Sequence, residues 1–430
     1  MSTGSLRRIG LRSAVALVVA NMLGAGVFTT SGFSLADLGS PGLVLVAWGI
    51  GGVLALCGAT CYGALARRLP ESGGEYAFLS ATIHPLAGFL AGWVSLLAGF
   101  TAPIAAAALG LQAYLGSALG DAVRPEWLGS GAIVAAALMH GMHLRVGLTL
   151  QDVAVGIKIL AIAAFVVVGA VAIGGVAPPA GTAPLVFEPG SFAVTLVWIS
   201  FAYSGWNAAV YVGGEVRDPD RNLPRSLWLG ASLVMVLYLA LNAVFVYSAP
   251  VDVLAGRADV GAAAAEALGG AGLRRALSAL VALALFTSVS SMVMAGPRVY
   301  ARMAEDGLFP QTFRAGEEVP GAAIALQAAL AVGVVWSTQL AELLSYIGFT
   351  LGLSAAATVL GLLAIRRREG AERVPIPGYP WIPVIYLLGT LGAAGFMVER
   401  RPGEAAAGIL TLAVGLPLYA WFRRRQRSAR

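Results

Sequence analysis

The chain has 430 residues, of which 58% are hydrophobic and 12% are charged. A soluble domain averages about 25% charged residues, so most of this chain cannot face water, and the lipid bilayer is its expected solvent. The net charge of +6 does not by itself indicate a nucleic-acid partner, because the arrangement of arginines described below accounts for it.

Apolar stretches recur along the whole chain, and a helix needs about 20 such residues to cross roughly 30 Å of hydrocarbon. They predict an all-α membrane protein with about twelve spans, at residues 11–36, 41–65, 86–116, 129–144, 150–174, 191–213, 226–248, 275–298, 321–337, 341–365, 381–398 and 404–422. The first stretch is too long for a signal-peptide core, so we expect it to be retained. We expect one domain over residues 1–430, with no room for a sizeable soluble domain.

The basic residues alternate between the loops on the two sides of this expected topology. If the N-terminus is inside, the inner segments hold 21 arginines and the outer loops only six, at positions 124, 257, 274, 275, 400 and 401. Cytoplasmic loops carry an excess of Lys and Arg, so both termini are expected in the cytoplasm of a bacterial cell, with the chain in the inner membrane.

The cysteines and histidines give little sign of metal chemistry. Cys57 and Cys61 lie four residues apart, so a helix puts both thiols on one face, which suits either half a metal site or small packing residues. Zinc needs about four ligands, and His84, His140 and His143 show no companion spacing, which favours packing. We expect no metal or cofactor, and interfacial, hydrogen-bonded roles for His140 and His143.

Two glycine-containing clusters would interrupt a helix near mid-membrane. Residues 21–26 (NMLGAG) lie in the first span and residues 201–207 (FAYSGWN) in the sixth, at matching places five spans apart. Transporters built from inverted repeats break the first helix of each repeat around the substrate, since unwound backbone in hydrocarbon is tolerated only beside a cavity. Close helix packing by small residues is the alternative interpretation.

The two breaks would offer different backbone groups. A half-helix beginning near Gly26 presents N–H groups that suit a carboxylate, whereas half-helices ending near Met22 and Ala202 present carbonyls that suit an ammonium group. A molecule that carries both groups is an amino acid.

Five motifs, in order along the chain, resemble the amino acid–polyamine–organocation superfamily. They are residues 24–28 (GAGVF), 69–76 (LPESGGEY), 201–207 (FAYSGWN), 222–224 (NLP) and 374–380 (VPIPGYP), and the sixth-span motif is most similar to the L-type amino acid transporter branch. The resemblance implies a LeuT-like five-plus-five inverted repeat, with residues 11–174 as the first repeat, 191–365 as the second, and two additional helices over 381–422.

The resemblance also implies a substrate site. The carboxylate would meet the amides of Ala25 and Gly26, and Phe201 would be the outer lid. Trp206 and Asn207 would flank the substrate side chain, and ordinary packing is the alternative for these two residues and for Phe201. The amine would meet carbonyls at Met22, Phe201, Ala202 and Ser204. Relatives often have Ser or Thr where this chain has Ala25, so one hydroxyl contact to the carboxylate is missing. The outer loop at residues 116–128 contains no cysteine, so we expect no disulfide-linked heavy chain.

Lys158 is the only lysine in the chain and lies in the fifth apolar stretch. An ionisable residue within a span is costly, and a lysine can lose its proton inside a protein, which an arginine cannot. The resemblance places it beside the broken first helix and the eighth span, where its ammonium could replace a sodium ion. Candidate coupling partners are Leu23, Gly24, Ser288, Ser290 and Ser291. Snorkelling toward the interface is the alternative.

The leading hypothesis is secondary transport of neutral L-amino acids by alternating access, either by exchange or linked to protons. An enzyme would need a catalytic set, and a channel would need a repeated filter or a charged ring, and the sequence contains neither. A polyamine or cationic amino acid carrier of the same superfamily is the alternative. It would require acidic residues in the pocket, whereas Asp152 and Glu342 fall near span ends.

Overall fold

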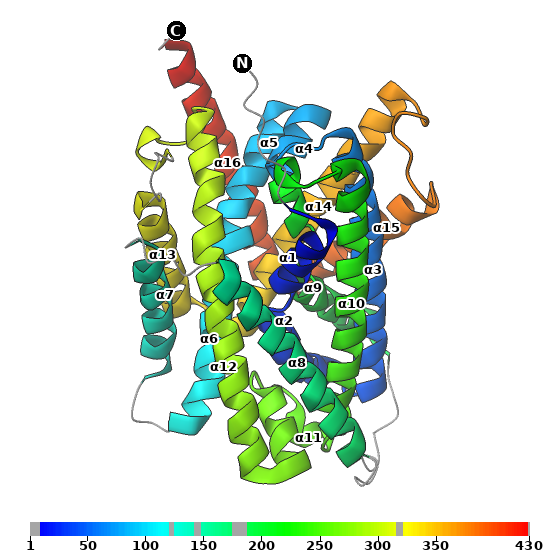
Figure 1. Ribbon diagram of the computed structural model, residues 1–430, viewed down its shortest axis with the longest axis vertical. Coiled ribbons are helices and arrows are strands. Elements are labelled where there is room, and N and C mark those ends of the chain that lie inside the picture. The colour runs from blue at the N-terminus through cyan, green and yellow to red at the C-terminus, as the bar shows by residue number, and fades with distance from the viewer. Residues whose placement is uncertain (1–8, 120–123, 142–147, 174–186, 315–320, 429–430) are drawn as a thin grey trace.

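The computed structural model describes residues 9–119, 124–141, 148–173, 187–314 and 321–428. Within these ranges the chain is helical, and the one strand-type pairing is an isolated bridge between Ile9 and Val216. The prediction of an all-α protein is therefore confirmed for the described part of the chain (Figure 1).

The first part of the chain forms a broken helix, a long helix, and then shorter elements. In order these are α1 (Leu11–Met22), α2 (Ala25–Leu38), α3 (Pro41–Arg68), α4 (Gly74–Thr82), α5 (Pro85–Val94), the π-helical η1 (Ser95–Thr101), α6 (Ala102–Leu119), α7 (Pro125–Gly141) and α8 (Leu148–Ile173). The segments α5, η1 and α6 follow one another without a gap, so the predicted third span contains a π-helical insertion.

The second part begins with another interrupted helix. It contains α9 (Pro189–Ala202), the 3₁₀ helix η3 (Ala208–Glu215), α10 (Pro219–Tyr247), α11 (Val251–Leu254), α12 (Val260–Glu305), the 3₁₀ turn η4 (Gln311–Phe313), α13 (Gly321–Ser337), α14 (Leu340–Glu369), α15 (Trp381–Arg400) and α16 (Pro402–Ser428).

Eight helices in the described ranges are long and apolar enough to cross a membrane, and a ninth span is obtained if α1 and α2, bent by 41°, are taken together. Shorter apolar helices, α9 and α13, also coincide with predicted spans. Each of the twelve predicted stretches contains a helix, while the count of twelve spans and the inverted repeat stay predictions.

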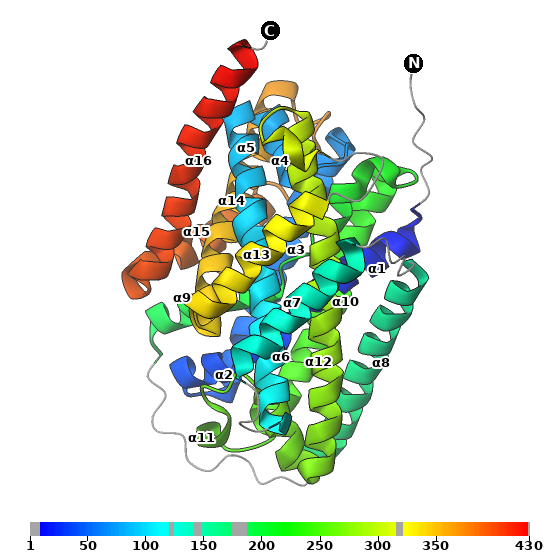
Figure 2. The same cartoon turned by 90° about the vertical axis from the view of Figure 1, so that its left-hand side faces the viewer.

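The eighth predicted span, expected from residue 275, lies in the second part of α12. This helix is interrupted at Gly269 and Gly270, whose φ and ψ angles are not helical, and its first part, from Val260, precedes the predicted span. Gly270 has a φ of 68°, which a glycine adopts without a Cβ clash. Together with α11, the first part of α12 forms a hairpin at one end of the bundle, opposite the end that carries α4 and α5 (Figures 1 and 2).

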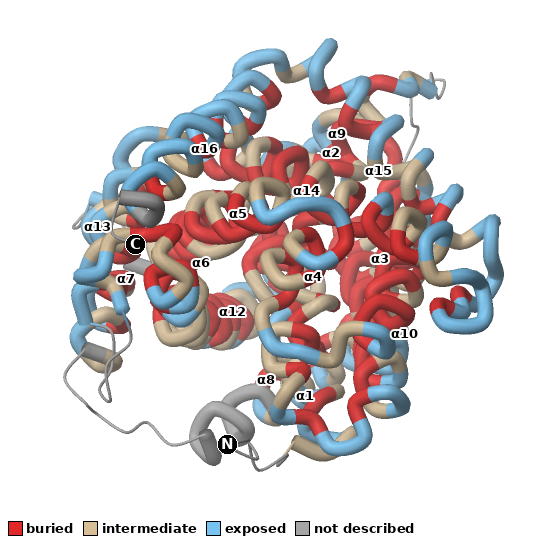
Figure 3. The backbone as a smooth tube through the Cα atoms, turned by 90° about the horizontal axis from the view of Figure 1, so that it is seen from above, coloured by how far each residue is buried: buried red, intermediate tan, exposed pale blue. Residues whose placement is uncertain are grey.

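The buried residues lie in the centre of the bundle, and the exposed ones lie on its outer helices and loops (Figure 3). Many exposed side chains are large and apolar, among them Leu160 and Val171 of α8, Leu388 of α15 and Leu410 of α16. An apolar outer surface of this kind suits hydrocarbon as the surrounding medium.

Candidate functional site

The first helix breaks where the sequence predicts, between α1 and α2. Leu23 has φ −72° and ψ 71°, and the Gly24 N–H donates to the Met22 carbonyl at 2.7 Å, which together make an inverse γ-turn. The helix α2 then begins at Ala25, and no side chain caps it. The first N–H groups of α2, at Ala25 and Gly26, have no acceptor within the helix, and they lie at its positive end.

The second break follows α9, which ends at Ala202 as predicted. The Ser204 N–H donates to the Phe201 carbonyl at 2.8 Å, and Gly205 has a φ of 96° before the chain resumes as η3. Residues 203–207 are thus non-helical backbone inside a predicted span. The two breaks are confirmed as features of the fold.

The two breaks touch each other, and glycines make the contact possible. A Cβ at Gly26 would lie 2.5 Å from the Ala202 Cα, and a Cβ at Gly205 would lie 2.8 Å from the carbonyl oxygen of Asn21. Four further candidate residues at this junction, Met22, Ala25, Phe201 and Ala202, are all nearly inaccessible. The free N–H end of α2 is therefore next to the carbonyl end of α9.

Tyr238 of α10 joins the two breaks, and the sequence analysis missed it. Its hydroxyl lies within hydrogen-bond distance of the Met22 carbonyl and 3.2 Å from the Ala202 carbonyl. A phenol has one hydrogen, so it donates to one of the two at a time. The Met22 carbonyl also accepts the Gly24 N–H, so its second lone pair is open to a substrate ammonium when the hydroxyl donates to Ala202.

Trp206 and Asn207 are directed toward α3 and α4. The Trp206 ring meets the Tyr62 ring edge-on, with centroids 4.6 Å apart, and the Asn207 side-chain amide donates to Glu75 Oε1 at 3.3 Å. Glu75 is a buried carboxyl group that the sequence analysis did not single out as a site residue. Its motif, residues 69–76, lies between two predicted spans and contains several polar residues, which is typical of an exposed loop. The Glu75 side chain is buried because α4 packs into the bundle.

Lys158 is buried, and its Nζ lies 3.5 Å from the Ser288 Oγ. The Ser288 hydroxyl in turn lies 3.3 Å from the Leu23 carbonyl at the first break and 3.0 Å from the Ala284 carbonyl. A chain of polar contacts therefore runs from α8 through α12 to the broken first helix. Ser290 instead meets His140 Nε2 at 2.8 Å.

The other candidate residues occupy ordinary positions. Ser291 lies in the next turn of α12 and is half-buried. Cys57 and Cys61 are buried free thiols, and the described residues contain no group of three potential metal ligands. Glu342 completes a capping box with Gln339 at the start of α14. His143 and the side chain of Asp152 lie outside the described residues.

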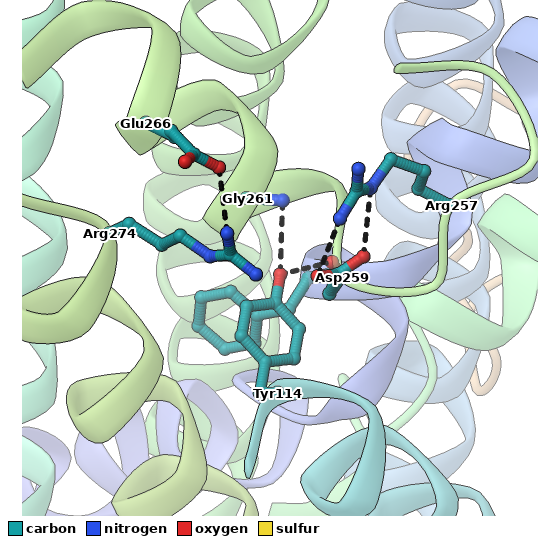
Figure 4. Close-up of polar contacts among 7 residues, drawn as sticks. Tyr114, Arg257, Asp259, Gly261, Glu266 and Arg274 are labelled. Atoms are coloured by element: carbon teal, nitrogen blue, oxygen red, sulfur yellow. Dashed lines mark hydrogen bonds and ion pairs between the residues drawn. The ribbon is translucent and has the colours of Figure 1, made fainter. Parts of the chain in front are cut away.

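The middle of α2 is covered by the hairpin of α11 and α12. The Gly256 N–H donates to the Gly32 carbonyl at 2.7 Å, and the Tyr114 hydroxyl donates to the Phe28 carbonyl at 2.7 Å while accepting the Gly261 N–H at 3.1 Å. Ion pairs within the hairpin, Arg257 with Asp259 and Arg274 with Glu266, brace it (Figure 4). The start of α2 thus forms the junction with α9, and its middle is held under this hairpin.

Comparison with known proteins decides the family. A model of amino acid permeases matches residues 9–403. The chain belongs to the amino acid permease family. The resemblance to the amino acid–polyamine–organocation superfamily is thereby confirmed, and the chain is a multi-pass membrane protein.

Three relatives show how far the similarity extends. The chain is 28% identical to the Asc-type amino acid transporter 1 of Mus musculus, over 96% of this chain and 80% of that protein. It is equally similar, with the same coverage, to the large neutral amino acids transporter small subunit 2 of Homo sapiens. It is 26% identical to the serine/threonine exchanger SteT of Bacillus subtilis, over 99% of both chains.

Proposed function

We propose that this protein carries neutral L-amino acids across the cytoplasmic membrane as a secondary transporter. The observation that carries the proposal is the contact between the start of α2 at Gly26 and the end of α9 at Ala202. Unpaired N–H groups and helix-terminal carbonyls lie side by side there, in the core of the bundle. An α-amino acid has one group that is complementary to each set.

The proposed contacts are those of the sequence analysis, with one addition. The substrate carboxylate meets the amides of Ala25 and Gly26, and its ammonium group meets carbonyls of Met22, Phe201, Ala202 and Ser204. Tyr238 is added because it holds the two carbonyl-bearing ends together. A ligand that lacks one group would leave buried backbone groups unpaired, at about 1–3 kcal/mol each.

The names of two relatives favour a neutral side chain over the polyamine or cationic alternative, since they refer to large neutral amino acids and to serine and threonine. The word exchanger in one of these names also supports exchange as the mode of transport.

Lys158 is proposed as the coupling residue, and Gly24, Ser288 and Ser291 are proposed as members of the same coupling site. Its ammonium would support the first break through Ser288 and Leu23, and a proton is the candidate coupling ion.

The proposed topology has both termini in the cytoplasm, without a disulfide-linked heavy chain. Cysteines introduced at positions 259 and 370 should react with an impermeant reagent from the outside and the inside, respectively, and the reverse pattern would contradict this orientation.

The experiment for the substrate class is competition for uptake into vesicles that contain the purified protein. Alanine, leucine and serine should compete, whereas putrescine, arginine and compounds with only an amine or only an acid should compete poorly. Equal competition by putrescine or arginine would replace this proposal with the cationic alternative. A thermal-shift screen in detergent provides a second measurement, because a ligand that binds only the folded state stabilises it by RT ln(1 + [L]/Kd).

A further inference from the structure

Glu75 is a buried titratable group to which the transport proposal gives no role. It stands at the start of α4, and 5% of its surface is exposed. Glu71, in the same motif, is exposed. A buried carboxyl group is costly unless it is well hydrogen-bonded, so its surroundings decide whether it is structural or functional.

Three donors from three parts of the chain converge on the Glu75 carboxyl group. The Tyr62 hydroxyl of α3 donates to Oε1 at 2.6 Å, and the Asn207 amide, just before η3, donates to the same oxygen at 3.3 Å. The Ser354 hydroxyl of α14 donates to Oε2 at 3.0 Å. A carboxylate, which only accepts hydrogen bonds, fits three donors, whereas a protonated carboxyl group must donate one bond and so changes the network.

The groups that face Glu75 are neutral. They are the phenols of Tyr62, of Tyr211 in η3 and of Tyr386 in α15, together with the hydroxyl of Ser354. No ion pair within the described ranges involves Glu75. Burial raises the pKa of the Glu75 carboxyl group, and the hydrogen bonds from Tyr62, Ser354 and Asn207 oppose this rise.

The same network reaches the residues at the side-chain end of the proposed substrate site. Asn207 is bonded to the carboxyl group directly, and Tyr62, which donates to it, supports the ring of Trp206. A Cβ at Gly58 would lie 2.8 Å from Trp206, so α3 packs closely against this ring. Tyr62 and Asn207 therefore meet at one carboxylate oxygen, and their positions depend on it.

We propose that Glu75 is a positioning residue of the substrate site, whose carboxylate fixes Asn207 directly and Trp206 through Tyr62, and whose protonation releases them. This inference rests on the proposed function, because it assigns a consequence for substrate affinity. Glu75 does not touch the substrate in this mechanism. It sets the arrangement of two residues that do.

The sign of the pH effect follows from the raised pKa. Above this pKa the carboxylate holds Asn207, and as the pH falls through it the hold is lost, so the KM for substrate should rise toward low pH. Glu75→Gln is uncharged at every pH, so its KM should be high and should lack the step that the titration of Glu75 causes. Hydrogen bonds to a charged group are roughly twice as strong as neutral ones, so we expect an increase of about fivefold to tenfold near neutral pH.

Tyr62→Phe provides a second variant with a different signature. It keeps the ring that packs against Trp206 but removes a donor that stabilises the carboxylate. The pKa of Glu75 should then rise further, and the midpoint of the KM profile should move to higher pH. A purely structural role for Tyr62 would not move this midpoint. Glu71→Gln makes the same charge change at an exposed position of the same motif and serves as the matched control.

The experiment is counterflow of labelled L-serine in vesicles that contain the purified full-length chain, with KM and Vmax measured from about pH 5 to pH 8. We expect the KM profiles of the wild type and of Glu71→Gln to show the step that Glu75 causes, the profile of Glu75→Gln to lack this step, and that of Tyr62→Phe to show it at higher pH. A profile for Glu75→Gln that runs parallel to the wild type, or an unmoved midpoint for Tyr62→Phe, would overturn the inference. If Glu75→Gln does not fold, the midpoint of the KM profile of Tyr62→Phe is the measurement that tests the inference.

Failure of the proposed function would look different. In that case wild-type vesicles would exchange none of serine, alanine or leucine, and this inference would fall with it. Exchange by the wild type together with an unchanged pH profile in both variants would instead leave the transport proposal standing and remove the role of Glu75.

Discussion

Gly26→Ala is expected to force apart the two helix breaks. The added Cβ would lie 2.5 Å from the Ala202 Cα and 2.6 Å from its Cβ. Carbon atoms prefer about 3.5–4.0 Å, so α2 and α9 must separate by about 1 Å, and they meet through backbone atoms that cannot rotate away. Overpacking of this kind costs about 1–3 kcal/mol, which corresponds to roughly fivefold to 150-fold in an equilibrium constant.

The assay has two readings, the apparent melting temperature in detergent and the rate of L-serine counterflow, and Gly26→Ala should lower both. Gly24→Ala is the matched control for stability, because a Cβ there would meet no atom closer than 3.9 Å and its φ of −117° is open to alanine. That variant should melt at the wild-type temperature or above it. Wild-type melting and transport by Gly26→Ala would refute the close approach of the two breaks.

Three further substitutions test individual roles. Tyr238→Phe removes the hydroxyl between the two breaks. Since a net hydrogen bond is worth about 1 kcal/mol, we expect about a fivefold loss in the rate of counterflow with retained folding. An unchanged rate would mean that this contact has no role in transport. Lys158→Ala should abolish or uncouple transport while leaving folded protein, and normal uptake with the wild-type pH dependence would favour snorkelling. Phe201→Ala should impair turnover more than binding, because a lid acts during the conformational cycle, and an equal loss of both would indicate a pocket wall.

Local chain properties were enough to predict the helix breaks. The stretch around Gly24 and Gly26 combines small residues with an apolar surrounding, and the same holds around Gly205. Breaks in such places can be predicted because glycine is a poor helix former and unwound backbone needs a function to remain in a membrane. The ends of α1 and α9, at Met22 and Ala202, were placed correctly for this reason.

The contacts across the bundle could not be predicted in the same way. Tyr238 lies 216 residues from Met22 in sequence, within an apolar span where an aromatic residue usually indicates packing. The partners of Glu75 come from three separate elements, and its own motif is polar enough to resemble a surface loop. Pairing of this kind depends on the tertiary arrangement, which a single sequence does not contain. The part of α12 before the interruption at Gly269 and Gly270 was not predicted, because it is too short to cross a membrane by itself.

The cover over the middle of α2 is built partly from main-chain atoms. The hydrogen bond from the Gly256 N–H to the Gly32 carbonyl involves no side chain, and a Cβ at Gly32 would lie 1.9 Å from the Arg257 carbonyl oxygen. An alanine scan that skips the glycines would leave the atoms of this bond in place and would understate the contact. Substitutions at Gly32 and at Gly256, whose φ is 76°, would expose how tightly the segment closes, so its contribution to the transport cycle is easy to overlook in a screen based on side-chain truncation.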